Sequence, residues 1–317
     1  MALLTLCAAF FLFFVPSLVV GQASLNSTAI PLPVPEGPYY EPYLREDCAN
    51  IGEINYMPAA VVEWFNENDL PSPDLTSFSQ LRFSDICLEA PTTKPDTLLL
   101  IWTGGFYTSR LHAYAGGAST YATSAYLQSI RVKDIEFVTG VFSETSEVIG
   151  LYGHSLGASS QTAVLQADTT GKYVAGYNLD GKLQPPVKPT GLDQKIYMFF
   201  AHDNHIIGSD PSWTAFWNTA DVLTPNDDRV SPELPKTIHN SFTDLPFIID
   251  VAGVRSVNES YFETLIDTIY GPRDIHDITS YVREFFDGTL KGVETHPFLD
   301  ASNSSLPDVL FVRKAGY

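Results

Sequence analysis

The sequence predicts an α/β fold, with a mostly parallel central sheet covered by helices on both faces. Three observations support this prediction. Continuous apolar runs, typical of strands buried on both faces, recur along the chain. Segments with helical spacing of apolar residues lie between these runs, as parallel strands require. One run leads through a glycine-flanked serine into a helix-like segment, which indicates a sharp turn at a strand end.

The predicted elements begin after a proline-rich segment and end with a helix. Residues 24–60 are rich in proline and are expected to be extended. The last helix has five apolar residues on one face, and residues 204–229 are expected to be irregular. Strands are predicted at 97–102, 148–152, 173–179, 195–201 and 234–238, and helices at 131–142, 158–168 and 274–286.

The composition predicts one large domain with an acidic surface. The chain has 317 residues, 44% of them hydrophobic, and shows neither a linker nor a repeat, so residues 24–317 are interpreted as a single domain. The formal net charge is −19. Such a surface argues against nucleic acid as a partner and against tight docking on anionic lipid. The simplest interpretation of this charge is that it keeps the protein soluble.

Residues 1–23 are interpreted as a secretory signal peptide. Residues 2–20 are almost wholly apolar, and Gly21 and Ala23 provide the small residues of a cleavage site. The alternative is an uncleaved membrane anchor, but the run is short for a spanning helix and contains Pro16. We therefore expect a secreted, extracellular protein without stable membrane insertion.

The remaining cysteines and the sequons fit the same compartment. Cys48 and Cys87 lie after the signal peptide, and in an oxidising compartment we expect them to form a disulfide with each other. The alternative is two separate buried thiols. N-glycosylation is expected at Asn26, Asn258 and Asn303, each of which begins an N-x-S/T sequon.

The candidate nucleophile is Ser155, in the segment Gly153-His154-Ser155-Leu156-Gly157. Small residues on either side allow the strand and the helix to approach closely and allow a strained backbone at the serine. A serine hydroxyl is a weak nucleophile at neutral pH, so it needs a base within hydrogen-bond reach and a carboxylate to orient that base. The alternative is a tight glycine turn with a structural serine.

His239 is the candidate base, because it opens a loop directly after the predicted strand 234–238. Asp180 and Asp203 each follow a strand end after the serine, and geometry alone permits either as the acid. His202 and His205 flank Asp203 as a possible surface ligand cluster, but loop polarity explains them more simply. Since the chain also has no C-x-x-C, H-E-x-x-H or phosphate-loop motif, no metal ion and no cofactor is predicted.

An oxyanion hole requires two backbone N–H groups aimed at the developing charge. One is expected from Leu156, the residue after the nucleophile. The other is expected from Gly105, in the Thr103-Gly-Gly-Phe106 loop that follows the first predicted strand. Glycine there allows the backbone to turn its amide inward.

These motifs together are similar to those of the platelet-activating-factor acetylhydrolase-like esterases, in particular their secreted fungal branch. The G-H-S-x-G segment matches at 153–157, an L-D motif one strand later at 179–180, an H-x-x-F-x-D stretch at 239–244 and R-x-x-D-x-x-F-V at 131–138. The resemblance covers about 97–286 and implies an α/β-hydrolase fold. It also implies that Asp180 rather than Asp203 is the acid, because the family acid lies one strand after the serine.

One central strand of the family pattern is missing between Gly105 and Arg131. The family places a helix, a strand and a long loop there, and that strand pairs with the one matched at 97–102. In this chain the interval is short, rich in Ala, Ser, Thr and Gly, and has no buried apolar run. Either the sheet pairs differently, or the sequence is a shortened gene product.

The expected function is that of a secreted serine carboxylic-ester hydrolase. The residues themselves support only an ester substrate, whether a small molecule or a lipid. The resemblance implies short acyl chains at the second position of a phospholipid such as platelet-activating factor. Two alternatives stay open: a polyester or feruloyl esterase, and a non-catalytic binding protein on a hydrolase scaffold. No protein partner is predicted.

Overall fold

The computed structural model describes residues 54–55, 82–83, 99–103, 124–142, 148–192, 196–226, 228–293 and 302–315. The predicted signal peptide, both cysteines of the predicted disulfide, Asn26 and Gly105 lie outside these ranges. Within them, no helix has the length and apolar character needed to cross a membrane.

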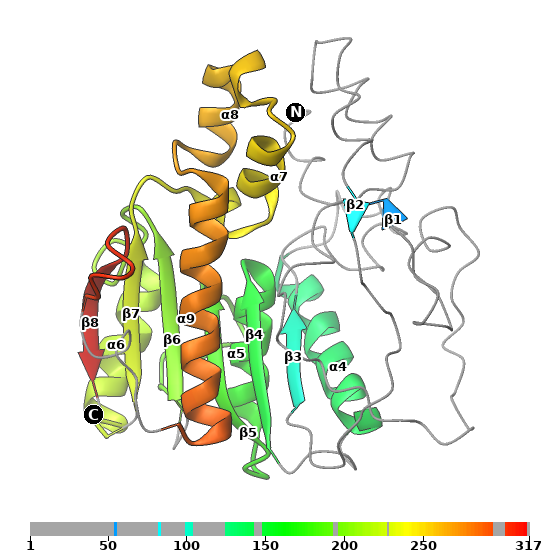
Figure 1. The fold of residues 1–317 in the computed structure, drawn as a ribbon. Helices are drawn as coiled ribbons and strands as arrows, with labels where there is room; N and C mark the ends of the chain where they lie inside the picture. Colours follow the sequence, from blue (N-terminus) through cyan, green and yellow to red (C-terminus); the bar gives the residue numbers. More distant parts are fainter. Residues whose placement is uncertain are drawn as a thin grey trace.

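A six-stranded sheet forms the centre of the molecule (Figure 1). The first five strands are parallel, and the last pairs antiparallel with its neighbour. A separate antiparallel pair joins β1 (Ile54–Asn55) to β2 (Arg82–Phe83). The strands of the large sheet, in spatial order, are β3 (Leu99–Thr103), β4 (Ile149–His154), β5 (Tyr173–Leu179), β6 (Ile196–His202), β7 (Arg229–Leu234) and β8 (Leu310–Ala315).

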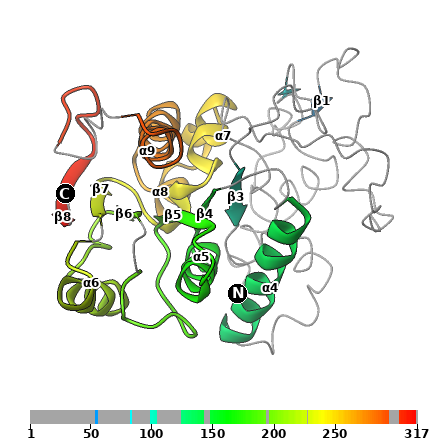
Figure 2. The same ribbon diagram turned by 90° about the horizontal axis from the view of Figure 1, so that it is seen from below.

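Helices cover both faces of this sheet (Figure 2). One face carries α4 (Ser124–Phe142), α5 (Leu156–Ala167) and α6 (Pro211–Leu223). The other carries α9 (Gly271–Lys291), while α7 (Leu245–Val251) and α8 (Glu259–Ile266) lie beyond the upper ends of the strands in the view of Figure 1. The predicted α/β class, a mostly parallel sheet between two helical layers, is therefore confirmed.

The continuous apolar runs have a simple cause in this layering. Along β6, Met198 and Phe200 pack into the hydrophobic cluster on the α9 side, whereas Tyr197 and Phe199 pack into the cluster on the α6 side. All four side chains are fully buried. A central strand of a two-sided sheet thus has no polar face, which is why period-two alternation is absent from its sequence.

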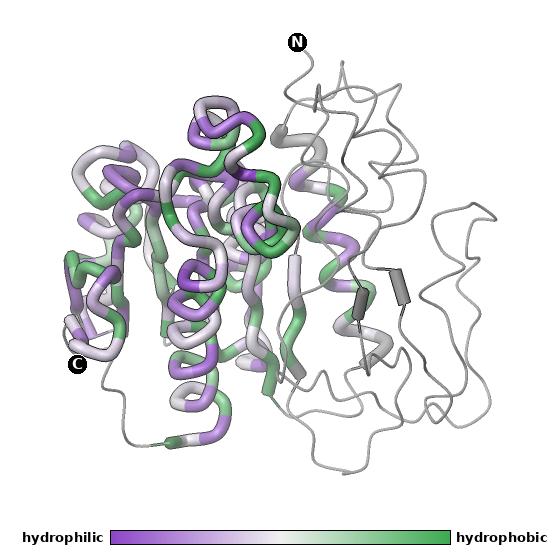
Figure 3. The backbone as a smooth tube through the Cα atoms, turned by 45° about the horizontal axis from the view of Figure 1, so that its top comes forward, coloured by the Kyte–Doolittle hydropathy of each residue, from purple (hydrophilic) through white to green (hydrophobic). Residues whose placement is uncertain are grey.

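Helix α9 shows the opposite pattern, because only one of its faces is covered. Tyr281, Val282, Phe285 and Phe286 are buried against the sheet. Figure 3 shows hydrophobic residues along the strands and hydrophilic residues on the outer turns of the helix in front. The helix ends at Lys291, and Gly292 follows it with a φ of 66°, the left-handed conformation that favours glycine after a helix.

Two expectations about elements are wrong. Residues 234–238 are not a strand, because β7 ends at Leu234 and a turn follows. Residues 204–229 are not irregular, since they contain α6. Strand β7 was not predicted because it contains Pro232, a residue that is unusual inside a strand. The pairing of β7 with β8 shifts register between Ser231 and Pro232, which accommodates a residue that cannot donate a backbone hydrogen bond to the neighbouring strand.

The interval with the missing strand is described in part. Residues 124–131 belong to α4, which therefore begins earlier than the predicted 131–142, and residues 104–123 lie outside the described ranges. Among the described strands, β3 pairs with β4 alone and stands at one end of the sheet order.

Candidate active site

Ser155 lies in a sharp turn between β4 and α5. Its φ of 56° is in the left-handed region, which L side chains rarely adopt. A side chain at Gly153 would have no room, since an added Cβ would lie 2.7 Å from the carbonyl carbon of Gly157. The Thr103 hydroxyl at the end of β3 donates to the Gly157 carbonyl at 2.8 Å and ties this turn to the neighbouring strand. The close approach of strand and helix therefore holds the serine in its strained conformation.

His239 lies beside this serine. It begins the short 3₁₀ helix η4 (His239–Phe242), and its Nε2 lies 2.8 Å from Ser155 Oγ. His154, fully buried, donates from Nε2 to the His239 carbonyl at 3.0 Å. Burial, followed by the nearby His239, lowers the pKa of His154 to about 3, so this imidazole is neutral. His154 therefore holds the backbone of the candidate base without competing for its proton.

Asp180 completes the line of contacts. It follows β5 directly, has no exposed surface, and its Oδ2 lies 2.5 Å from His239 Nδ1. Burial acts to raise the pKa of this carboxyl, but hydrogen bonds from His202, His205 and His239 outweigh burial and lower the pKa well below its usual value. The carboxylate is therefore ionised and accepts a hydrogen bond from the Nδ1–H of His239.

The turn that carries Asp180 is held by its own hydrogen bonds. The Gly181 N–H donates to Asn178 Oδ1 at 2.6 Å, and the Asn178 amide donates back to the Gly181 carbonyl at 2.9 Å. The indole N–H of Trp213 donates to the same carbonyl at 2.8 Å. The structure thus brings Ser155, His239 and Asp180 together. Asp203, the rival acid, instead accepts from the Asn204 side chain at 2.7 Å.

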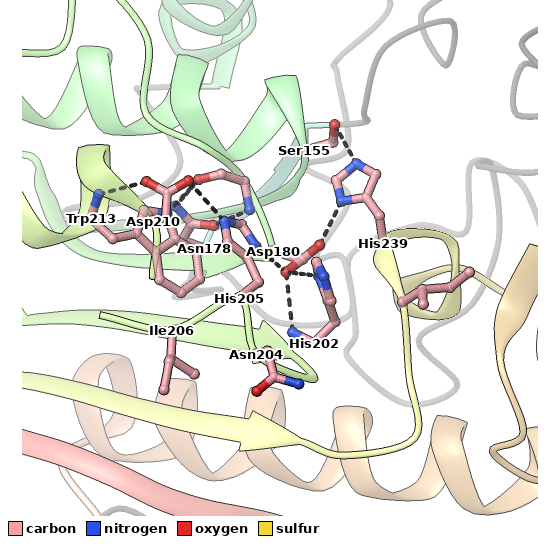
Figure 4. Close-up of polar contacts among 12 residues, drawn as sticks. Ser155, Asn178, Asp180, His202, Asn204, His205, Ile206, Asp210, Trp213 and His239 are labelled. Atoms are coloured by element: carbon pink, nitrogen blue, oxygen red, sulfur yellow. Dashed lines mark hydrogen bonds and ion pairs between the residues drawn. The ribbon is translucent and has the colours of Figure 1, made fainter. Parts of the chain in front are cut away.

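Two further histidines contact Asp180 (Figure 4). The Nδ1 atoms of His202 and His205 lie 2.6 Å and 2.5 Å from Asp180 Oδ1. His205 Nε2 also lies 3.1 Å from Asp210 Oδ2. The interpretation of these histidines as ordinary polar loop residues was therefore wrong. Their position at the end of β6, which neighbours β5, was the one signal in the sequence that could have placed them here.

A pocket of about 290 Å³ opens over these residues. Leu156 is the first residue of α5, so its N–H has no acceptor within the helix and is available to a ligand. The other predicted oxyanion donor, Gly105, lies outside the described residues. The described residues that line the pocket are Ser155, Leu156, Asp180, Lys182, Gln184, His202, His205, Asp210 and His239.

Two groups of side chains here have metal-ligand chemistry. They are His154, Asp180 and His239, and Asp180, His202 and His205; in each, the ligand atoms lie within 4.8 Å of one another. In both groups, however, a hydrogen bond already joins Asp180 to a neighbouring imidazole. Hydrogen bonding within the cluster therefore accounts for the arrangement of these side chains.

The two described sequons are not among the residues that line this pocket. Asn258 precedes α8, and Asn303 accepts a hydrogen bond from the Ser305 N–H at 2.8 Å in the segment between α9 and β8. Both side chains are partly exposed. Their glycosylation stays a prediction.

Comparison with known proteins supports the resemblance drawn from the motifs. No family model matches the chain. A curated protein of Arthroderma benhamiae named "Probable 1-alkyl-2-acetylglycerophosphocholine esterase" is 31% identical over 207 residues, which is 62% of this chain and 53% of that protein. The chain thus spans about half the length of this relative. The predicted likeness to this kind of esterase is confirmed.

A solved structure shows the same fold. The ferulic acid esterase of Streptomyces cinnamoneus superposes with a TM-score of 0.61 at 22% sequence identity, covering 80% of this chain and 83% of that one. At this identity the likeness concerns the fold. With the six-stranded sheet and the turn at Ser155, it confirms the predicted α/β-hydrolase fold.

Proposed function

We propose that this protein is a serine carboxylic-ester hydrolase. The observation that carries the proposal is the unbroken line of contacts from the Ser155 hydroxyl through both nitrogens of His239 to the buried Asp180 carboxylate. The three residues come from separate segments, and Ser155 sits at a strained turn beside the pocket. A non-catalytic binding protein would not need this arrangement, which is the one that activates a serine for acyl transfer.

In the proposed mechanism each of these residues has one role. Ser155 Oγ forms a bond with the ester carbonyl carbon while its proton passes to His239 Nε2. Asp180 keeps the Nδ1 proton of His239 in place and stabilises the imidazolium that forms. The negative charge that develops on the carbonyl oxygen is held by the Leu156 N–H and, as predicted from sequence, by that of Gly105.

The second half of the reaction returns the enzyme to its starting state. The tetrahedral intermediate collapses, the alcohol leaves with the proton from His239, and the acyl group stays on Ser155. A water molecule then gives its proton to His239 and attacks the acyl carbonyl, which releases the carboxylic acid. No cofactor is required for either step.

For the substrate, we propose a short-acyl phospholipid of the kind named for the Arthroderma relative. Lys182 lines the pocket and offers a positive charge to a phosphate group close to Ser155. Because the chain covers only half of that relative, and because the structural neighbour is a ferulic acid esterase, feruloyl esters and polyesters are the competing substrates.

The deciding experiment is labelling with a fluorophosphonate followed by mass spectrometry of the tryptic peptides. We expect one adduct, on Ser155, and loss of that adduct and of p-nitrophenyl acetate hydrolysis in Ser155→Ala. The matched control is Ser304→Ala, a change at an exposed serine between α9 and β8, which should behave as wild type. Turnover retained by Ser155→Ala, with unchanged circular dichroism, would count against the proposal.

Substrate choice needs a separate measurement. The wild-type protein is offered a 2-acetyl phospholipid, a feruloyl ester and a polyester, and kcat/KM is compared. We expect the highest value for the phospholipid. A Lys182→Gln variant should lose part of this preference while its p-nitrophenyl acetate hydrolysis stays unchanged, because the acetate carries no phosphate.

A further inference from the structure

Asp180 accepts more hydrogen bonds than a catalytic triad uses. A triad needs one imidazole on its carboxylate, whereas Asp180 faces the Nδ1 atoms of three histidines and also accepts from the His202 backbone N–H at 3.1 Å. Of the two additional rings, His205 is the more enclosed, with 14% of its side chain exposed against 24% for His202. The contact of His205 with Asp180 therefore needs an explanation beyond the catalytic triad.

The two contacts of the His205 ring require it to carry a positive charge. Its Nδ1 lies 2.5 Å from Asp180 and its Nε2 lies 3.1 Å from Asp210. A neutral imidazole has a single N–H and could donate to only one carboxylate. Two ionised carboxylates on opposite nitrogens therefore select the imidazolium.

Asp210 is ionised because of its position at the start of α6. It is the N-cap of α6, and its Oδ1 accepts from the Ser212 N–H at 2.7 Å and the Trp213 N–H at 2.9 Å. The positive end of the helix dipole also favours a carboxylate at this position. Burial acts to raise the pKa of Asp210, but the hydrogen bonds from His205 and Ser212 outweigh it and lower the pKa.

Trp213 adds a third favourable contact. The His205 ring stacks on this fully buried indole with 4.5 Å between the ring centroids and 28° between the planes. A cation stacked on an indole face is stabilised electrostatically. Burial acts to lower the pKa of His205, but the hydrogen bonds to Asp180 and Asp210 outweigh it and raise the pKa to about 9.

We propose that His205 is a positioning residue, held as an imidazolium, which bridges the triad carboxylate to the N-terminus of α6 and sets the pH range in which His239 acts as a base (Figure 4). The bridge fixes the orientation of Asp180 from the side opposite His239. The part that concerns His239 rests on the proposed function; the charge and bridging of His205 do not.

The consequence for pH follows from the charges. A cation on Asp180 offsets part of the negative charge that favours the protonated form of His239. His239 is therefore expected to remain a neutral base at a lower pH than it would beside an uncompensated carboxylate. The groups that face this cluster are Asp180 after β5, Asp210 and Trp213 at α6, His202 at the end of β6, Lys182 in the pocket, and Glu233 of β7, which accepts from the Asn204 N–H.

The first test concerns the charge and needs no activity. The full chain is labelled with ¹⁵N-histidine, and the His205 ring signals are assigned by their loss in His205→Gln. We expect both ring nitrogens of His205 to be protonated at pH 7.5 in the wild type, and one to be deprotonated in Asp210→Asn. A neutral His205 at pH 7.5 in the wild type would overturn the proposal.

The second test measures the pH dependence of fluorophosphonate labelling of Ser155. In His205→Gln and in Asp210→Asn, which keeps an N-cap acceptor, we expect the acid limb to move to higher pH by about half a unit to one unit. The matched control is Asp203→Asn, which removes a carboxylate from the same loop. Loss of a negative charge by itself moves the acid limb of the labelling profile to lower pH. The direction of the shift therefore separates loss of a carboxylate from loss of the imidazolium.

The outcomes are distinguishable. If the wild type shows no labelling of Ser155, the proposed function fails, while the ¹⁵N spectra still decide the charge of His205. Unshifted acid limbs in both folded variants would overturn the role of His205 in setting the pH range. Labelling lost on treatment with EDTA and restored by Zn²⁺ would mean that Asp180, His202 and His205 hold a metal ion, and would also overturn it.

Discussion

At the scale of single residues, the site is defined by side chains that have little freedom. Ser155 and Asp180 both adopt positive φ, at 56° and 53°, directly after strand ends. Each backbone is fixed by its surroundings: the Ser155 N–H donates to the Leu179 carbonyl, and the Asp180 N–H donates to the Phe200 carbonyl. The strain at both positions is sustained by the sheet, which is the usual condition for strained residues at a functional site.

Asp180→Asn tests the role of the carboxylate. We expect kcat to fall by about 10⁴, because an amide cannot hold the correct tautomer of His239 or stabilise its charged form. The protein should remain folded, since the two side chains have the same size. Steady-state kinetics with p-nitrophenyl acetate, compared with Asp203→Asn as the control, measures the loss. A larger loss in the Asp203 variant would reverse the assignment of the acid.

At the scale of elements, the turn between β4 and α5 depends on a close approach that only glycine permits. At Gly153 an added Cβ would meet the Gly157 and Thr103 backbones, both at 2.7 Å. Backbone atoms on two sides cannot both move aside without disturbing β3 and α5. The same elements carry the candidate nucleophile, so packing and the position of Ser155 are coupled.

Gly153→Ala should therefore destabilise the protein by about 1–3 kcal/mol, the usual cost of overpacking, and should also reduce labelling of Ser155. Gly140→Ala in α4 is the matched control, because nothing lies within 4 Å of its added Cβ. There the same substitution should stabilise the helix by about 0.5–1 kcal/mol. Urea unfolding measures both changes; an equal effect at the two positions would contradict the packing argument.

At the scale of the whole molecule, the His205 bridge links folding to pH. The pKa of His205 is raised from 6.5 to about 9 in the folded protein, so the folded state binds more protons than the unfolded state between these values. The stabilisation from His205 is complete below about pH 6.5 and is lost as the pH rises through about 9.

We therefore expect the difference in the free energy of unfolding between wild type and His205→Gln to shrink from pH 6.5 to pH 9. Urea unfolding at several pH values in this window, with the wild type and the variant measured side by side, gives the difference. Taking a difference removes the contributions of other titrating groups, including those of an acidic chain with a net charge of −19. A constant or growing difference would contradict the assigned charge.

Sequence analysis predicted what depends on local pattern. The strand at 173–179 was placed with its observed bounds, and the turn at Ser155 was placed from its glycines and flanking apolar run. Helix α6 was missed although a signal was present: Asp210 as N-cap, Pro211 in the first turn, and apolar residues at helical spacing. Strand β8 had no such signal, because it is an edge strand whose side chains are exposed or half-buried.

By itself the sequence determined the α/β class, the strained serine turn and a short set of possible bases and acids, because spacing and chain order are local properties. Tertiary structure decided which of these side chains meet. Asp180 and His205 lie at the ends of neighbouring parallel strands, and only the register between β5 and β6 brings them within 2.5 Å. The charge on His205 likewise depends on two carboxylates, Asp180 directly after β5 and Asp210 at the N-cap of α6, and no local sequence pattern shows that these two meet the same ring.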